Sequence, residues 1–326
     1  MTSPIGVGII GANRYAAALE DYAAPLAGAA VSAIAPSPNG RDRTAAAALA
    51  RRLPAAFARD WGSVARDPAL GVVLVASDDP GRGAAVEAAL GAGKIVVCPA
   101  PAATTTEALD RLSAVQTRGH GVLLASGEIR HTPAGARAVA LAAAGGLGTL
   151  HSIYAAVRLR VPTRASGADS VLDRVGWDLL DTLCAAVPHA PRRVHATVAG
   201  LFGGTEDTAA IVARLGDETI ATIDLSRCLP ASIPTVPQGE VEIEMIGSRD
   251  ALRLEPYRTA VRFHGERGAA RLPWIDEPVL SMLHEGVRIA AGEAARPNHF
   301  EHFRRVVGFM DAVKASAARG DTVTVA

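Results

Sequence analysis

Short, continuous apolar runs recur along the first part of the chain, with alanine-rich amphipathic stretches between them. Apolar runs of this length, without polar interruption, are typical of strands buried on both faces of a parallel sheet. The amphipathic stretches between them predict helices at about 14–26, 41–52, 80–92 and 104–118, so the pattern indicates βαβ units in a doubly wound sheet. The predicted strands are Ile5–Ile10, Ala30–Ala35, Val72–Ala76, Ile95–Cys98 and Val122–Ala125.

The pattern changes after about residue 148. A long extended segment at Leu150–Val161 and a helix at Ser170–Ala186 precede strand-like runs that follow one another without helices between them. Such runs predict a large open, mainly antiparallel sheet. We therefore expect an α/β chain with two domains, residues 1–128 and 129–326, and a final helix at about 299–318 that could pack back on the first domain. The runs are Arg193–Leu201, Ala209–Leu215, Thr219–Leu225, Glu240–Gly247 and Ala251–Leu254.

Composition excludes several functional classes. Lys+Arg and Asp+Glu total 33 each, so no excess of positive charge favours nucleic acid or an anionic membrane as a partner. The three cysteines are far apart and form no CxxC pair, and the chain has no signal-peptide pattern and no long uncharged apolar run. His299 and His302 lack a third metal ligand in view, so we expect no metal. These features predict a soluble, cytoplasmic protein.

The turn after the first strand has the position of a phosphate-binding loop. Dinucleotide folds place a glycine-rich turn there, so that the N–H groups of the next helix face a pyrophosphate. Compared with G-x-G-x-x-G/A, Gly11 and Ala16 match, whereas Asn13 replaces the middle glycine; asparagine tolerates positive φ better than most residues. The sequence of this loop predicts that a nucleotide is contacted by Gly11, Ala12, Asn13 and Arg14. The alternative is that the loop only connects the strand to the helix.

The end of the second strand bears on the choice of cofactor. It reads Ile34-Ala35-Pro36-Ser37 and lacks the acid that usually binds a ribose 2′-OH. Ser37 and Arg41 come next, and an arginine near this position can meet a 2′-phosphate, which favours NADP over NAD. The alternative is that Arg41 and Arg43 merely begin a solvated helix.

With these features in order, the whole chain resembles the Gfo/Idh/MocA oxidoreductase family. Ala92–Cys98 resembles the family's AGKHVLCEKP stretch, and Gly146–Ser152, the helix with Gly176 and Asp181, and the Gly-Ser turn within Glu242–Leu252 follow in the family's order. The resemblance implies a Rossmann domain, a C-terminal α/β domain with a large open sheet, and a nicotinamide site between them. It also implies homodimers or homotetramers packed through the sheets, and it places Ser77, Pro99 and Ala100 beside the cofactor.

The residues that carry the family's chemistry are replaced. The family's Glu-Lys-Pro falls on Pro99-Ala100-Pro101, so the lysine that contacts the nicotinamide ribose and helps move the substrate proton is Ala100 here. Neither lysine of the chain can substitute, because Lys94 begins the same strand at its opposite end and Lys314 lies on the terminal helix. The family's Asp-x-Gly-x-His-x-x-Asp falls on residues 174–181, where Arg174 replaces the first acid and Asp178 replaces the catalytic histidine.

Two further departures add carboxylates. Ser77-Asp78-Asp79-Pro80 stands where the family has Thr-Pro-Asn, and Glu128 replaces the asparagine of its GYNxRF stretch. A carboxylate in a closed cleft can serve as acid or base. Asp178 and Glu128 are therefore the candidate acid/base residues, with Arg130 and Arg174 as possible partners for an anion; alternatively, Arg174 and Asp178 form a surface ion pair of little energy.

Three functions remain open on this evidence. The leading hypothesis is an enzyme that performs an atypical or non-redox reaction on a small polar metabolite. The second is an NADP-dependent oxidoreductase with remodelled acid/base residues, and the third is a ligand sensor or partner-binding protein without catalysis. The cofactor is accordingly NADP, NAD or none, and fold alone does not decide between these functions.

Overall fold

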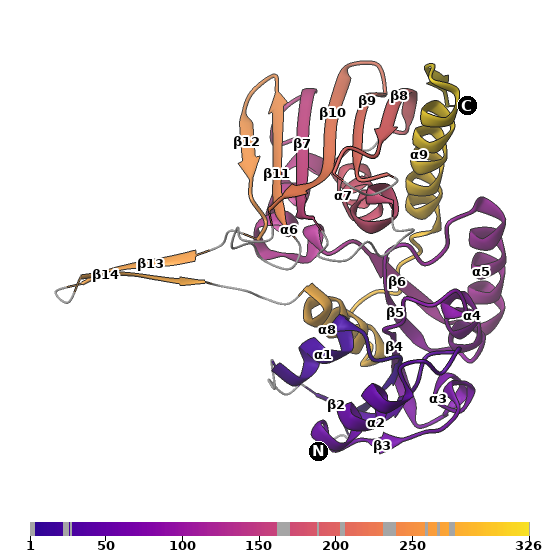
Figure 1. Ribbon diagram of the computed structural model, residues 1–326. Coiled ribbons are helices and arrows are strands. Elements are labelled where there is room, and N and C mark those ends of the chain that lie inside the picture. Colours follow the sequence, from indigo (N-terminus) through magenta and orange to yellow (C-terminus); the bar gives the residue numbers. More distant parts are fainter. Residues whose placement is uncertain are drawn as a thin grey trace. The chain divides into compact units, whose positions relative to one another are not determined.

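The computed structural model describes residues 4–21, 26, 28–161, 170–187, 189–202, 206–230, 239–257, 260–265, 268–273 and 278–325. The chain forms two units (Figure 1). Unit 1 comprises Met1–His131 and Glu277–Phe303, and unit 2 comprises Thr132–Asp276 and Arg304–Ala326. The sequence predicts a single boundary at residue 128, whereas the chain crosses at His131 and returns to unit 1 with a later helix.

Unit 1 contains a six-stranded parallel sheet in the order β3-β2-β1-β4-β5-β6. The order reverses between β1 and β4, as in a doubly wound Rossmann sheet, so the predicted fold class is confirmed for this unit. Its elements are β1 (Ile5–Ile10), α1 (Arg14–Asp21), β2 (Ala29–Ala35), α2 (Arg43–Arg52), β3 (Ala56–Phe57), α3 (Trp61–Arg66), β4 (Leu70–Val75), α4 (Arg82–Gly91), β5 (Ile95–Pro99), α5 (Thr106–Gly119), β6 (Val122–Ser126), a 3₁₀ turn η1 (Ile129–His131) and α8 (Pro278–Ala290).

Helix α8 covers part of the first sheet, although it lies far along the sequence. Its buried residues share a core with the inward side chains of β1, β4 and β5 and with α1 and α2. Gly286 lets the helix approach the sheet closely, because a Cβ there would lie 3.2 Å from a methyl group of Val97. Figure 1 shows α8, in the orange of the later sequence, among the indigo and magenta elements of unit 1.

Unit 2 contains a seven-stranded sheet in the order β12-β11-β7-β10-β9-β8-β15, in which only the β7–β10 pair is parallel among the described strands. The predicted open, mainly antiparallel sheet is therefore confirmed. Its elements are α6 (Pro133–Ala143), β7 (Leu150–Arg160), a π-helical turn η2 (Leu172–Gly176), α7 (Trp177–Ala186), β8 (Pro191–Ala199), β9 (Thr208–Leu215), β10 (Thr219–Leu229), β11 (Glu240–Gly247), β12 (Ala251–Leu254), the separate hairpin β13 (Ala260–Gly265) and β14 (Gly268–Pro273), α9 (Phe300–Arg319, in unit 1 up to Phe303) and β15 (Val323–Thr324).

Strand β9 and the first part of β10 alternate between buried side chains and exposed or half-buried ones. Ala209, Ile211 and Ala213 of β9 point into the unit, whereas Val212 points outward and is 48% exposed. Ile220 on β10 and Ile246 on β11 are likewise exposed. The outer face of the sheet therefore carries several large apolar side chains, an arrangement typical of interaction surfaces.

None of the described helices is long and apolar enough to cross a membrane.

Candidate functional site

The turn after β1 has the backbone of a dinucleotide-binding loop. Gly11 has φ of +97°, and a Cβ on it would lie 2.2 Å from the carbonyl oxygen of Ala76. The Gly11 N–H donates to the carbonyl of Ala35 over 2.9 Å, which fixes the turn between the ends of β1 and β2. Only glycine fits this position, because other residues rarely adopt such a φ and have no room here.

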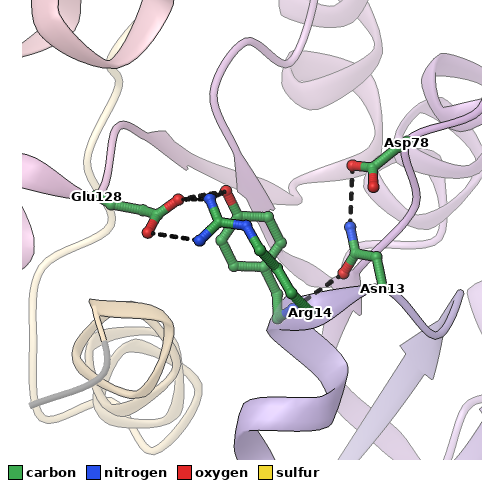
Figure 2. Close-up of polar contacts among 5 residues, drawn as sticks. Asn13, Arg14, Asp78 and Glu128 are labelled. Atoms are coloured by element: carbon green, nitrogen blue, oxygen red, sulfur yellow. Dashed lines mark hydrogen bonds and ion pairs between the residues drawn. The ribbon is translucent and has the colours of Figure 1, made fainter. Parts of the chain in front are cut away.

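Asn13 acts through its side chain rather than through an unusual backbone. Its φ is not positive, so the turn does not use the conformation that asparagine tolerates. Instead, its Oδ1 accepts the N–H of Tyr15 over 3.1 Å and caps the start of α1. Its Nδ2 donates to Asp78 Oδ1 over 3.0 Å (Figure 2). One first-turn N–H of α1 is thus already hydrogen-bonded within the loop.

A carboxylate does lie at the end of β2, although the strand itself ends without an acid. Asp42 Oδ2 accepts the N–H of Ala12 over 2.8 Å, and its Oδ1 accepts both the N–H (2.8 Å) and the hydroxyl (2.7 Å) of Ser37. The sequence interpretation favoured NADP because of Arg41. This residue is exposed, and its backbone N–H donates to the Asn39 side chain. The sequence interpretation missed Asp42, although an aspartate beside a Pro-Asn-Gly turn and before a helix was the available signal.

The loop after β4 uses its polar groups locally. Ser77 is buried and its hydroxyl accepts the N–H of Asp79 over 3.2 Å. Asp79 in turn accepts the N–H of Gly81 over 2.6 Å, while Asp78 bonds Asn13. Asp79 therefore stabilises the turn into α4, and Asp78 stabilises the loop after β1.

The end of β5 provides no proton carrier. Pro99 is buried, and the half-buried Ala100 donates its N–H to the carbonyl of Ser126 over 2.9 Å. Lys94 lies at the amino end of β5, 6% exposed, where its Nζ donates to the carbonyls of Asp67 and, over 2.7 Å, Leu70. Burial lowers the pKa of Lys94, and the nearby Asp67 opposes this shift. The expectation that Lys94 cannot replace the missing lysine agrees with this position.

The segment after β6 ties Glu128 to the loop after β1 (Figure 2). The Glu128 carboxylate forms a two-pronged ion pair with the Arg14 guanidinium, one contact being 3.0 Å, and accepts the Tyr15 hydroxyl over 2.6 Å. Arg130 is half-buried in η1, and Nε2 of His131 lies 2.7 Å from the Ser126 hydroxyl. In this arrangement Glu128 is an ion-pair partner of Arg14.

Unit 2 holds the remaining candidates. Asp178 is half-buried in the first turn of α7, and Arg174 is exposed in the π-helical turn before it. Lys314 of α9 pairs with Asp173 over 2.8 Å. The predicted helix is confirmed, but its first part is a π-helical turn, a feature common at functional sites.

The burial of Cys98 and the spacing of possible metal ligands bear on two further kinds of chemistry. Burial raises the pKa of the Cys98 thiol, with Arg82 opposing that shift, so the thiol is disfavoured as a nucleophile. Across the described parts of the chain, no three His, Cys, Asp or Glu side chains gather as a metal site would require.

The site candidates thus fall into two groups. Gly11, Ala12, Asn13, Arg14, Ser37, Arg41, Ser77, Pro99, Ala100, Glu128 and Arg130 belong to unit 1, and Asp178 and Arg174 belong to unit 2. Those of unit 1 follow β1, β2, β4, β5 and β6, whose carboxyl ends share one edge of the parallel sheet. Ligands of open α/β sheets bind at this edge.

Comparisons with known proteins agree with this architecture. Residues 5–126 match the family model described as "Oxidoreductase family, NAD-binding Rossmann fold". A comparison with curated proteins finds no match.

Solved structures resemble the chain over nearly its whole length. A probable dehydrogenase from Thermotoga maritima has 20% identity and a TM-score of 0.76, covering 98% of this chain and 99% of its own. A putative myo-inositol dehydrogenase from Sinorhizobium meliloti 1021 has 18% identity and a TM-score of 0.77, covering 99% and 100%. A scyllo-inositol dehydrogenase from Lactobacillus casei, solved with NAD(H) and scyllo-inositol, has 19% identity and a TM-score of 0.76, covering 99% of both chains. Residues 5–126 therefore match the model of the Gfo/Idh/MocA oxidoreductase family, and the chain as a whole has the fold of these dehydrogenases.

Proposed function

We propose that the protein binds an NAD-type dinucleotide at the carboxyl edge of the first sheet and acts on a small polar metabolite, with acid/base chemistry that differs from that of its family. The observation that carries the proposal is the pairing of an intact glycine turn at Gly11 with an alanine at position 100. The first supports cofactor binding, and the second removes the lysine that the family resemblance implies for proton transfer.

The residues of the loop fit the adenosine side of a dinucleotide. Gly11 allows the tight turn, and α1 begins directly after it with its N-terminus toward the loop. Asp42 Oδ2 accepts one N–H and keeps a lone pair for a ribose hydroxyl, the role of the acid in NAD-binding folds, whereas Oδ1 is engaged by Ser37; the charge of Asp42 would repel a 2′-phosphate. We therefore propose that the cofactor is NAD. This proposal replaces the preference for NADP that the sequence suggested from Arg41. A bound nicotinamide would supply hydride transfer.

Asp178 is the acid/base candidate that we favour. It stands at the position of the family's histidine, and it is half-buried in the first turn of α7. A carboxylate at this position could exchange a proton with a bound metabolite through its Oδ atoms. Glu128 is the weaker candidate, because the Arg14 guanidinium and the Tyr15 hydroxyl occupy its oxygens.

The first test is a titration of the full-length protein with NAD(H) and NADP(H), followed by reduced-cofactor fluorescence and thermal shift. Turnover is then screened with scyllo-inositol and myo-inositol, the polyols named for the similar structures. A change in nicotinamide absorbance would support the redox form of the proposal, and product without that change would support non-redox chemistry. Binding without turnover would favour a ligand sensor, and absence of binding at millimolar cofactor would contradict the proposal.

Replacing Asp178 with asparagine is expected to lower kcat about 100-fold or more, because general acid/base catalysis contributes on that scale. Asp173→Asn is the matched control: this acid lies on the same helical segment but pairs with Lys314 and is exposed. Steady-state kinetics should show nearly normal turnover for the control. Wild-type kcat in D178N would remove Asp178 from the mechanism.

We further propose that two copies of the chain associate through the outer face of the second sheet. Val212, Ile220 and Ile246 provide exposed apolar area there. Ile220→Glu is expected to shift the protein to a smaller species in size-exclusion chromatography with light scattering. Leu201→Glu, at an exposed apolar position outside the strands, is the control and should leave the mass unchanged. A monomeric wild type would refute this interface.

A further inference from the structure

The ion pair between Arg14 and Glu128 connects residues that follow two strands lying far apart in the first sheet. Arg14 is the first residue of α1 and follows the turn after β1, whereas Glu128 follows β6. In the strand order, β4 and β5 lie between β1 and β6. With neighbouring strands about 4.8 Å apart, the two ends are separated by roughly 14 Å. The Arg14 and Glu128 side chains, together with Tyr15, thus bridge the edge beside the ends of β4 and β5; we refer to these three residues as the clasp.

The clasp combines an ion pair with hydrogen bonds and a cation–π contact. Both carboxylate oxygens of Glu128 are engaged by the Arg14 guanidinium, and Oε1 also accepts the Tyr15 hydroxyl. The guanidinium lies 4.3 Å from the centroid of the Tyr15 ring and donates to the Tyr15 hydroxyl over 2.7 Å. The Glu128 side chain is 7% exposed, whereas that of Arg14 is 44% exposed. Arg14 is therefore the member that a ligand from solvent reaches first.

The clasp crosses the space that a dinucleotide uses in this type of fold. A pyrophosphate binds at the start of α1, and the second nucleotide extends from the point of strand reversal over the later strands of the sheet. Here that direction leads from β1 over β4 and β5 toward β6. A phosphate at the start of α1 would compete with Glu128 for the positive charge of Arg14, and Glu128 itself would repel the phosphate.

We propose that the clasp gates dinucleotide binding: the incoming pyrophosphate takes Arg14 from Glu128 and opens the edge beside β4 and β5. This inference rests on the proposed cofactor binding and assigns to Glu128 a role in affinity rather than in proton transfer. The gate lowers affinity in the free protein, because each binding event must first break the ion pair.

The test is calorimetric titration of NAD and NADH into the full-length protein and its variants. Glu128→Gln keeps hydrogen-bonding capacity but removes the charge, and it is expected to bind both forms about tenfold more tightly, a change of about 1.4 kcal/mol. Tyr15→Phe removes one hydrogen bond from the clasp and should give a smaller gain in the same direction. Arg14→Gln removes the cation as well, and it should bind no more tightly than the wild type.

Glu87→Gln is the matched control for removal of a carboxylate from an ion pair. Glu87 of α4 pairs with Arg111 of α5 over 3.3 Å in the same unit, on a pair of exposed side chains. The affinity of E87Q for NAD and NADH should equal that of the wild type. If the wild type binds and neither E128Q nor Y15F gains affinity, the gate is wrong while the proposed function stands. If no variant and no wild type binds millimolar NAD or NADH, both inferences fail.

Discussion

Gly11→Ala is expected to lower the free energy of unfolding by about 3 kcal/mol or more and to abolish dinucleotide binding. The new Cβ would lie 2.2 Å from the Ala76 carbonyl oxygen, on a residue held at φ of +97°. The backbone has little freedom to move away, because Gly11 is bonded to Ala35 and the Ala76 N–H donates to Ile10 over 2.8 Å. Denaturant unfolding measures the stability, and cofactor titration measures the binding.

Gly83→Ala is the control for this substitution. Gly83 lies in α4 of the same unit, and a Cβ there would meet no atom within 4 Å. Alanine should stabilise the helix slightly, because glycine costs more backbone entropy. If G11A unfolded at the same denaturant concentration as the wild type, the turn after β1 would not be strained in the way described.

Asp42→Ala is expected to weaken NAD binding about tenfold and to shift the NADP-to-NAD preference by about 100-fold toward NADP. NAD binding weakens because the proposed hydrogen bonds from the ribose to the charged carboxylate are lost. The preference shifts further because the carboxylate no longer repels a 2′-phosphate. Parallel titrations with NAD, NADH, NADP and NADPH measure both. Asp42 is thus expected to dominate cofactor choice, despite the arginines that flank it.

Asp60→Ala separates this effect from a general loss of stability. Asp60 also precedes a helix of unit 1, and its side chain accepts the N–H of Ser63 over 3.0 Å. D60A should lower stability by about 1 kcal/mol, the usual cost of losing an N-cap, without changing the ratio of the two cofactor affinities. Tighter binding of NADP than of NAD by the wild type would refute the role of Asp42.

The fold could be predicted because most of its strands can be recognised from the pattern of their own residues. Val72–Val75 and Ile95–Cys98 are uninterrupted apolar runs and proved to be central parallel strands. The strand-like run at Glu240–Gly247 proved to be β11, with the same bounds. Short elements such as β3 were missed, because two residues carry no periodic signal.

The contacts of the candidate site were not accessible from local pattern. Asp42 bonds a residue 30 positions earlier, and Glu128 pairs with one 114 positions earlier. Such pairs depend on how loops at the sheet edge fold back, which neither spacing nor propensity encodes. Glu128 could be identified as a candidate from its chemistry, but its ion-pair partner became visible only in three dimensions.

The place of α8 in unit 1 also affects how the protein is made. Synthesis runs from the N-terminus, so all six strands of the first sheet leave the ribosome before α8 exists. Val279, Leu283 and Val287 complete the hydrophobic core on one face of that sheet. Until they arrive, the nascent Rossmann unit exposes apolar surface from β4 and β5 while the strands of the second sheet are being translated. The core on this face of the first sheet is therefore completed only after the main strands of the second sheet have been synthesised.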